Sequence, residues 1–264
     1  TTQRWSGWAY NPQNLPRVSG KPSDALRNCL TAGDGKKVVV ADLSGIELRV
    51  NHFLWQVPSS MALYQADPEK ADLYKDFAAA LYGIDKSEVS KQQRQVGKVA
   101  HLGLGFGAGA ATFQKVAKLM GGVDLTQEEA LEVVTKWRGM YKEIVAGWKK
   151  CHEALVFIAN GIERPVDPWE LCWTCADGIR TPKGLISYPD LRQEVIDECG
   201  KKEWVYGQGR NKARIYAGKV TENIVQHLAR NVMADDMLKI EKLTGYPIAL
   251  TVHDEAVLVV PETE

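Results

Sequence analysis

The sequence predicts an α+β fold, in which short antiparallel strands near both ends of the chain accompany a long, mainly helical middle. A β-branched run ends in a carboxylate at 37–42, and Ala, Leu, Lys and Glu dominate residues 60–160. Two apolar runs at 246–260 are separated by three polar residues, the pattern of an antiparallel hairpin. With 264 residues, 45% apolar and 25% charged, the chain can bury a core in one or two domains.

Residues 1–35 are rich in Pro, Asn, Ser and Gly and predict an extended, loop-dominated start. The run Lys37–Asp42 is typical of a strand buried on both faces. Ser44 then predicts a helix cap, with Glu47 three residues later as in a capping box. We therefore expect a strand, a sharp turn and a helix.

Helices and short strands are also expected along the rest of the chain. Prolines and glycines punctuate the helical middle, and two turn signals predict short strands: Asp177-Gly178 and Lys183-Gly184. Residues 219–243 return to helical spacing. The final hairpin carries His253, Asp254 and Glu255 at its tip.

Composition excludes few functions. Lys plus Arg and Asp plus Glu number 33 each, so net charge gives no sign of nucleic-acid binding. No stretch approaches the roughly 18 apolar residues of a membrane span, and the N-terminus lacks a signal-peptide layout. We expect a cytoplasmic protein without membrane contact.

The chain has five cysteines, for which reduced thiols are the favoured interpretation. Cys172 and Cys175 have the spacing of half a zinc site, with Cys151, His152 and Cys199 as the remaining candidates. A second tight pair is missing, so structural zinc is the minor alternative.

Three features carry chemistry. Asp42 ends a predicted strand and could hold a hard cation, although alone it would read as a turn former. Asp254 and Glu255 crowd two carboxylates onto a tight turn, where a cation would offset their repulsion, although alone they would read as an exposed acidic turn.

The third feature is a run with a four-residue repeat, Arg94, Lys98, Leu102 and Phe106. On a helix this spacing places two cations above an apolar platform, which suits a triphosphate and its base. Four glycines at alternate positions from 103 to 109 predict a close approach of backbone or ligand, namely Gly103, Gly105, Gly107 and Gly109. Together the three features predict a two-metal phosphoryl-transfer site.

The same residues resemble, in order, the motifs of family A DNA polymerases, the group of bacterial DNA polymerase I. Residues 42–49 resemble the first catalytic motif, 94–107 the nucleotide-binding fingers helix and 252–255 the third motif. Residues 4–16 resemble the preceding segment that touches the primer–template duplex.

The resemblance implies a right-hand polymerase fold, with an antiparallel palm sheet and a helical fingers insertion. Residues 1–54 and 206–264 would form the palm and 55–205 the fingers. Thumb and exonuclease domains are absent from this chain, so we expect a portion of a longer polypeptide that binds and extends primer–template poorly when alone.

The resemblance also implies roles for individual residues. Those expected at two Mg²⁺ ions, for which Mn²⁺ could substitute, are Asp42, Leu43 and Asp254, with Glu255 in support. Those expected at the incoming nucleotide are Ser44, Gly45, Ile46, Glu47, Arg94, Lys98, Leu102 and Phe106. Those expected at the primer–template DNA are Arg4, Asn11, Gln13, Asn14, Gly103, Gly107, Asn223, Gln226 and His253. Lys98 would protonate the leaving pyrophosphate, and Glu47 would crowd the sugar 2′ position and so select dNTP.

Some positions depart from the family pattern. Leu102 stands where the family usually has Phe or Tyr, Phe106 stands where it usually has Tyr, and Gly45 replaces a common Gln. Either Asn223 or Gln226 could be the amide that contacts the duplex. These departures favour a bacteriophage or prophage member, acting in a bacterial or phage-infected cell.

Two other functions stay open. A single-subunit RNA polymerase would share the palm, although the residues around Glu47 favour deoxynucleotides. A truncated, non-catalytic DNA-binding fragment would have no need of Asp42, Lys98 and Asp254. A replisome or processivity partner cannot be identified from the sequence.

Overall fold

The computed structural model describes residues 2–3, 5, 29–196 and 199–263 of the chain. The protein divides into two compact units, one formed by Glu47–Val225 and the other by Thr2–Ile46 with Gln226–Glu264. Helix α9 (Ala217–Thr244) contributes residues to both units. Helices and antiparallel sheets occur together, so the predicted α+β class is confirmed.

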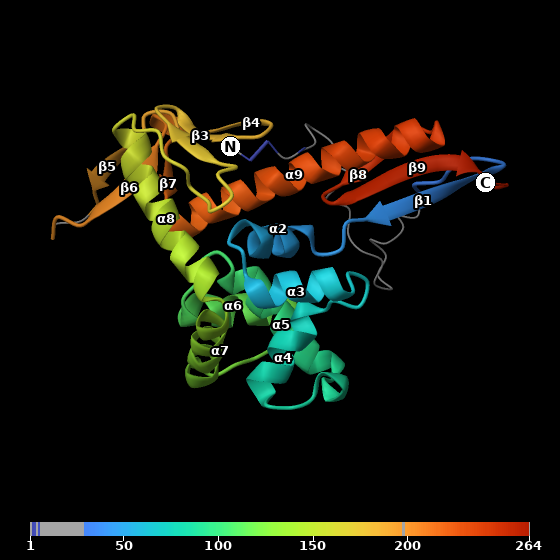
Figure 1. Ribbon diagram of the computed structural model, residues 1–264, viewed down its shortest axis with the longest axis horizontal. Coiled ribbons are helices and arrows are strands. Elements are labelled where there is room, and N and C mark those ends of the chain that lie inside the picture. Colours follow the sequence, from blue (N-terminus) through green and yellow to red (C-terminus); the bar gives the residue numbers. More distant parts are fainter. Residues whose placement is uncertain (1, 4, 6–28, 197–198, 264) are drawn as a thin grey trace. The chain divides into compact units, whose positions relative to one another are not determined.

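The unit formed by Thr2–Ile46 and Gln226–Glu264 is built on a three-stranded antiparallel sheet of order β1-β9-β8 (Figure 1). Its strands are β1 (Lys36–Asp42), β8 (Ile248–Val252) and β9 (Glu255–Pro261). The register of β1 and β9 runs from Lys36 opposite Pro261 to Asp42 opposite Glu255. The predicted closing hairpin is confirmed, with Val252 paired to Glu255 across the turn.

Strand β1 differs from its prediction in burial. Every residue of the strand is exposed, and 54% of the Val40 surface is accessible. In the described part of the chain β1 pairs only with β9, so it is an edge strand. The prediction of burial on both faces was wrong because β-branched residues favour strand backbone even where no layer covers them.

The other unit is mainly helical, as the middle of the sequence predicted. Its helical segments are α2 (Ile46–Leu54, beginning one residue before the unit), α3 (Pro58–Ala66), α4 (Leu73–Tyr82), η3 (Lys86–Glu88), α5 (Lys91–Leu104), α6 (Ala110–Gly121), α7 (Gln127–Met140) and α8 (Lys142–Ala159). Reciprocal capping boxes begin three of them, with Asp85 and Glu88 at η3, Ser90 and Gln93 at α5, and Thr126 and Glu129 at α7. Each box satisfies backbone N–H groups that the first helical turn leaves unpaired.

Helix α5 lies at the centre of this unit and packs against α4, α6 and α7. The surrounding core contains fully buried Phe77, Leu104, Phe113 and Trp137. A glycine is required where α5 meets α4, because a Cβ on Gly97 would lie 2.2 Å from the carbonyl oxygen of Tyr74. The two helix backbones therefore touch at this crossing.

Two small antiparallel sheets complete the helical unit. One has the order β2 (Trp173–Cys175), β3 (Gly178–Thr181), β4 (Gly184–Ser187); the other has the order β5 (Arg192–Val195), β6 (Lys202–Tyr206), β7 (Ala213–Ile215). The predicted turns at Asp177-Gly178 and Lys183-Gly184 are confirmed as the two connections of the first sheet. A short 3₁₀ turn, η4 (Gly209–Asn211), precedes β7.

None of the five cysteines, all of them described, forms a disulfide bond; Cys151 and Cys172 are buried, and Cys29 and Cys199 are exposed. Burial raises the pKa of Cys151 to about 12, and Thr221 Oγ1 donates a hydrogen bond to its Sγ. Among the described residues, no three His, Cys, Asp or Glu side chains gather into a metal-binding group. Nor does this part of the chain contain a helix with the length and apolar character of a membrane span.

Candidate active site

The residues that follow β1 and β8 are joined through the main chain. Asp42 is the last residue of β1 and lies opposite Glu255 in the register with β9. The N–H of Leu43 donates a hydrogen bond to the carbonyl oxygen of Asp254, with an N···O distance of 3.1 Å. Asp42 and Asp254 therefore occupy chain segments that the sheet places side by side.

The turn that carries Asp254 has an unusual backbone. His253 has a φ of 55°, in the left-handed region that non-glycine residues adopt with difficulty. Its side chain is exposed, while Asp254 is half-buried. Strained residues of this kind persist where the surrounding structure fixes them, and here the two strands of the hairpin do so.

The connection from β1 to α2 is a tight turn in which the Ser44 N–H donates to the Asp42 carbonyl and the Ile46 N–H to the Leu43 carbonyl, each at 3.1 Å. Gly45 has a φ of 61°, and the helix begins at Ile46. The prediction that Ser44 caps this helix was wrong, because the glycine stands between it and the first helical residue. Glu47 lies in the first turn of α2.

The donor atoms at this turn suit a hard divalent cation. Asp42 and Asp254 offer carboxylate oxygens, and the Leu43 carbonyl retains one lone pair after accepting from Ile46. Within the described residues, the carboxylates do not form a three-ligand cage by themselves. Magnesium is commonly held by one or two carboxylates together with substrate phosphates, so this set fits Mg²⁺.

Helix α5 carries the predicted cationic stripe, but only in part. Arg94, Lys98 and Leu102 lie within the helix, and Leu102 is exposed. Phe106 lies beyond the last helical residue, in the turn closed by a hydrogen bond from the Gly107 N–H to the Leu104 carbonyl. The prediction of one continuous four-residue stripe was therefore wrong at Phe106, because Gly105 and Gly107 end the helix.

The glycine-rich turn after α5 is tightly held. The Gly105 carbonyl accepts hydrogen bonds from Asn51 Nδ2 at 3.3 Å and Trp148 Nε1 at 3.2 Å. A Cβ on Gly105 would lie within 3.0 Å of that Asn51 nitrogen, so the expected close approach is confirmed there. It is absent at Gly109, where no described atom lies within 4 Å, while Gly103 makes ordinary contacts and Gly107 needs its φ of 85°.

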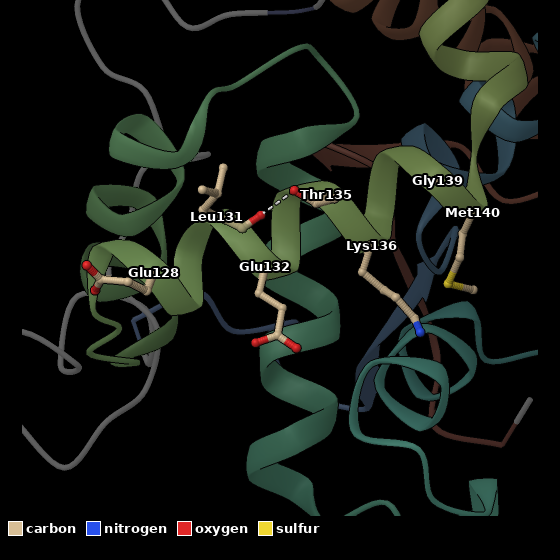
Figure 2. Close-up of a pocket in the computed structure, with 7 residues that line it drawn as sticks. All are labelled: Glu128, Leu131, Glu132, Thr135, Lys136, Gly139 and Met140. Carbon is tan, nitrogen blue, oxygen red and sulfur yellow. Dashed lines mark hydrogen bonds between the residues drawn. The ribbon is translucent and has the colours of Figure 1, made fainter.

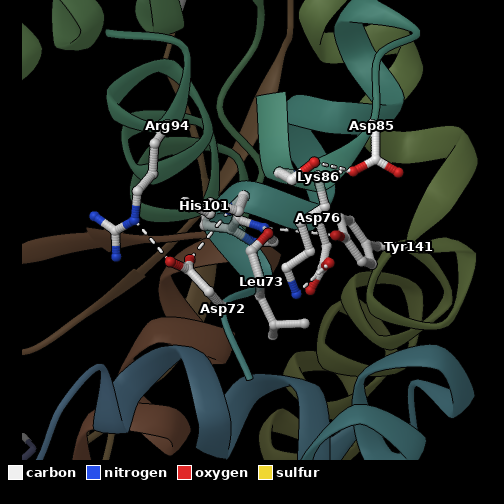
Figure 3. Close-up of polar contacts among 10 residues, drawn as sticks. Asp72, Leu73, Asp76, Asp85, Lys86, Arg94, His101 and Tyr141 are labelled. Atoms are coloured by element: carbon white, nitrogen blue, oxygen red, sulfur yellow. Dashed lines mark hydrogen bonds and ion pairs between the residues drawn. The ribbon is translucent and has the colours of Figure 1, made fainter. Parts of the chain in front are cut away.

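The two cations of α5 differ in their partners. Arg94 Nε donates to Asp72 Oδ2 at 2.7 Å (Figure 3). The Arg94 guanidinium lies over the Tyr74 ring, 5.2 Å from the centroid. Lys98 is half-buried and makes no ion pair with any described residue. Burial by itself raises the pKa of Asp72, but the Arg94 side chain and the Lys75 backbone N–H reverse this and hold the pKa below its ordinary value.

A buried aromatic cluster lies against α5 on the side of His101. The His101 ring accepts from Trp137 Nε1 at 3.4 Å and contacts the Leu73 carbonyl at 3.3 Å, while its centroid is 5.3 Å from that of His52. Burial lowers the pKa of His101 to about 4. Burial, followed by the charge of His101, also lowers the pKa of His52. Both rings are therefore neutral at pH 7.

The residues predicted to contact the duplex differ in burial. Asn223 is buried and donates through Nδ2 to the hydroxyl of Tyr188 at 3.0 Å, whereas Gln226 is half-buried. Arg4, Asn11, Gln13 and Asn14 lie outside the described residues.

A surface hollow lies elsewhere, along one face of α7 (Figure 2). It has a volume of about 680 Å³ and is lined by Glu128, Leu131, Glu132, Thr135, Lys136, Gly139 and Met140. None of the candidate residues lines this hollow. A second hollow of about 380 Å³, between α2 and α3, includes Arg49, His52 and Tyr64.

Comparison with known sequences identifies the family. The sequence profile described as DNA polymerase family A matches residues 1–156. This chain belongs to DNA polymerase family A. The match extends from the start of the sequence through β1, the α2 turn and the glycine-rich end of α5.

Relatives of this family A chain include a phage protein and bacterial enzymes. A DNA polymerase of Bacillus phage SP02 is 29% identical over 300 residues, covering 98% of this chain and 45% of the relative. The thermostable DNA polymerase I of Thermus filiformis is 27% identical and covers 99% of this chain and 27% of the relative. The family A chain thus spans less than half the length of these two relatives.

A solved structure supports the predicted polymerase fold. It is described as the POL domain of Pol1 from M. smegmatis in complex with DNA primer-template and dNTP, with a TM-score of 0.61 and 18% identity. The match covers 99% of this chain and 40% of that chain. At this identity the likeness concerns the fold alone.

Sequence reasoning missed the residues that hold Arg94. Asp72 occupies the cap position before α4, and a sequence signal existed, since an Asp ahead of an amphipathic run is a typical N-cap. The contact of Asp72 with Arg94, which belongs to α5, has no signal in the sequence.

Proposed function

We propose that this family A chain carries the nucleotidyl-transfer site of a DNA-directed DNA polymerase. The reaction adds a deoxynucleotide to the 3′-hydroxyl of a primer on a template and releases pyrophosphate. The observation that carries the proposal is the main-chain pairing of the Asp42 and Asp254 segments, which brings two carboxylate residues to one end of a sheet. Family membership and relatives named DNA polymerase support it.

Two Mg²⁺ ions, or Mn²⁺ in their place, would be held by Asp42, Asp254 and the Leu43 carbonyl, with Glu255 supporting the carboxylates. When bound, such ions activate the attacking hydroxyl and neutralise charge on the leaving pyrophosphate. The contribution of the chain is to fix the carboxylates in place. The register of β1 with β9 and the Leu43 hydrogen bond support this by placing the main chain of Asp42 beside that of Glu255, and Leu43 beside Asp254.

The nucleotide would be held by α5 and the start of α2. Arg94 and Lys98 would bind phosphate oxygens, because guanidinium and ammonium groups form strong charge-assisted hydrogen bonds with them. Lys98, which has no ion-pair partner among the described residues, would also protonate the pyrophosphate. Leu102 and Phe106 would contact the base, and Glu47 the sugar 2′ position, with Ser44, Gly45 and Ile46 lining the nucleotide.

The primer–template would be contacted by Gln226, Gly103, Gly107 and His253, together with the N-terminal residues Arg4, Asn11, Gln13 and Asn14. Gln226 is favoured over Asn223, because the Asn223 amide is buried and already donates to Tyr188. The assignment of residues 1–54 and 206–264 to the palm and 55–205 to the fingers belongs to the same proposal.

The experiment is primer extension by the complete polypeptide, with dNTP or NTP and with Mg²⁺ or EDTA, beside a binding titration on the same primer–template. We expect Mg²⁺-dependent incorporation of dNTP in preference to NTP. Preferred use of NTP would instead indicate an RNA polymerase. Duplex binding without incorporation of dNTP or NTP in the presence of Mg²⁺ would indicate a non-catalytic DNA-binding protein and would contradict the proposal.

A further inference from the structure

The contact between Arg94 and Asp72 has a geometry that leaves Arg94 available for a second partner. Of the three guanidinium nitrogens of Arg94, only Nε donates to Asp72, at 2.7 Å. The two terminal guanidinium nitrogens make no hydrogen bond or ion pair with any described residue, and Figure 3 shows them turned away from the carboxylate. These two nitrogens are the pair that binds phosphate oxygens in a bidentate manner.

Asp72 is itself held in place. Its other oxygen, Oδ1, accepts from the backbone N–H of Lys75 at 3.1 Å and so caps α4. The start of α4 is in turn fixed against α5, because the Tyr74 carbonyl packs directly on Gly97. One carboxylate thus ties the first turn of α4 to a side chain of α5.

The Tyr74 ring supports the guanidinium from a second direction. The Arg94 Cζ lies 5.2 Å from the ring centroid, within the range of a cation–π contact. Arg94 is more than one-third exposed. An arginine with this exposure would ordinarily sample many rotamers, and ordering it upon binding would reduce affinity.

We propose that Asp72 is a positioning residue that holds Arg94 by Nε, with Tyr74 beneath it, so that the terminal nitrogens are presented to the triphosphate of the incoming nucleotide. The inference rests on the proposed function and adds a residue to it. The ion pair need not break when phosphate binds, since it uses a nitrogen that a bidentate phosphate contact leaves free. Asp72 touches no reacting atom in this scheme.

The charge of Asp72 is compatible with a neighbouring triphosphate. Arg94 lies directly against it, and Lys86, which pairs with Asp76 at 2.7 Å, contributes further positive charge (Figure 3). An isolated carboxylate at this place would repel the ligand. Arg94 and Lys86 balance the charges of Asp72 and Asp76, so these two carboxylates place no net negative charge against the ligand.

The test variant is Asp72→Asn. Asparagine is as good an N-cap as aspartate, so its single oxygen can continue to cap α4 while the charged acceptor for Arg94 is lost. The matched control is Asp76→Asn, which removes an ion pair of the same length on the same helix without touching Arg94. The reference variant is Arg94→Ala, alone and combined with Asp72→Asn.

Single-turnover incorporation by the complete polypeptide on a primer–template gives the Kd of Mg·dNTP and the maximal rate separately. We expect Asp72→Asn to raise the Kd of dNTP by about threefold to tenfold, with little change in maximal rate, primer–template Kd or Tm. Asp76→Asn should leave the Kd of dNTP unchanged. In the Arg94→Ala background, Asp72→Asn should have no further effect, because the two residues act as one unit.

Two results would overturn the inference in different ways. If Arg94→Ala weakens dNTP binding while Asp72→Asn leaves it unchanged or tightens it, the role of Arg94 stands and only the positioning role of Asp72 is excluded. If Arg94→Ala itself leaves the Kd unchanged, the phosphate contact in the proposed function fails, and this inference fails with it.

Discussion

The N–H of Leu43 donates a hydrogen bond to the carbonyl oxygen of Asp254 at 3.1 Å. It joins the residue after β1 to the turn between β8 and β9, so both aspartates are positioned by backbone geometry. Their side chains are exposed or half-buried and contribute little to the core. Substitutions that remove their charge should therefore affect chemistry far more than folding.

Asp42→Asn and Asp254→Asn should each reduce the single-turnover incorporation rate by several orders of magnitude, because each retains shape but loses the charge that fixes the metal ions. Tm and primer–template affinity should stay near wild-type values. Asp236→Asn, which alters a surface ion pair with Lys239 on α9, is the control and should incorporate normally. Near-normal incorporation by either test variant would exclude the two-aspartate assignment.

Glu47→Ala should relax discrimination against ribonucleotides more than it weakens deoxynucleotide use, because the proposed role of Glu47 is to crowd the sugar 2′ position. The measurement is kcat/KM for dNTP and NTP with the same template base. A ratio equal to that of the wild-type protein would remove this role from Glu47.

The buried histidines predict a pH-dependent stability. Folded His101 has a pKa of about 4, whereas an unfolded histidine titrates near 6.5. Between these values the unfolded chain binds a proton that the folded chain refuses, so stability is complete above about pH 6.5 and falls as the pH drops toward 4. For His101 the loss reaches roughly 3 kcal/mol, and His52 adds to it in the same direction.

Urea denaturation at pH 7.5 and 5 measures this effect. His101→Gln should flatten the dependence of unfolding free energy on pH, while lowering stability at pH 7.5. His152→Gln, at an exposed position on α8, should retain the wild-type slope. Parallel pH curves for His101→Gln and the wild type would contradict the assignment.

Gly97→Ala should destabilise the protein by about 1–3 kcal/mol, because its Cβ would lie 2.2 Å from the Tyr74 carbonyl and force α4 from α5. Gly139→Ala is the control, since its Cβ would meet no described atom within 4 Å on an exposed face of α7. In that helix alanine should stabilise by about 0.5–1 kcal/mol. Equal unfolding free energies for the two variants would show that the helices do not touch at Gly97.

The sequence predicted those elements whose cause is local. The hairpin around His253 and Asp254, the turns at Gly178 and Gly184 and the helical middle all follow from periodicity and turn residues. The helical stripe failed at Phe106, because Gly105 and Gly107 end the helix before it. Two residues distant in sequence, Asn51 and Trp148, then hold the turn at Gly105.

Burial and long-range pairing could not be predicted from one sequence. A run of valines such as that of β1 has the same sequence whether or not another layer covers the strand, so the exposure of these valines could not be predicted. The contact of Asp72 with Arg94 depends on how α4 crosses α5. Buried Asn223 and half-buried Gln226 are three residues apart on α9, and only their surroundings distinguish them.

The unequal burial of the five thiols makes the protein suitable for fluorescent labelling without engineered cysteines. Cys151 and Cys172 are buried and burial raises the pKa of each thiol, so a maleimide that attacks thiolates should spare them. Exposed Cys29 belongs to the unit with the β1-β9-β8 sheet, and exposed Cys199 to the helical unit. Once half-buried Cys175 is replaced by serine, a donor and an acceptor dye on these two thiols would report directly whether dNTP changes the distance between the units.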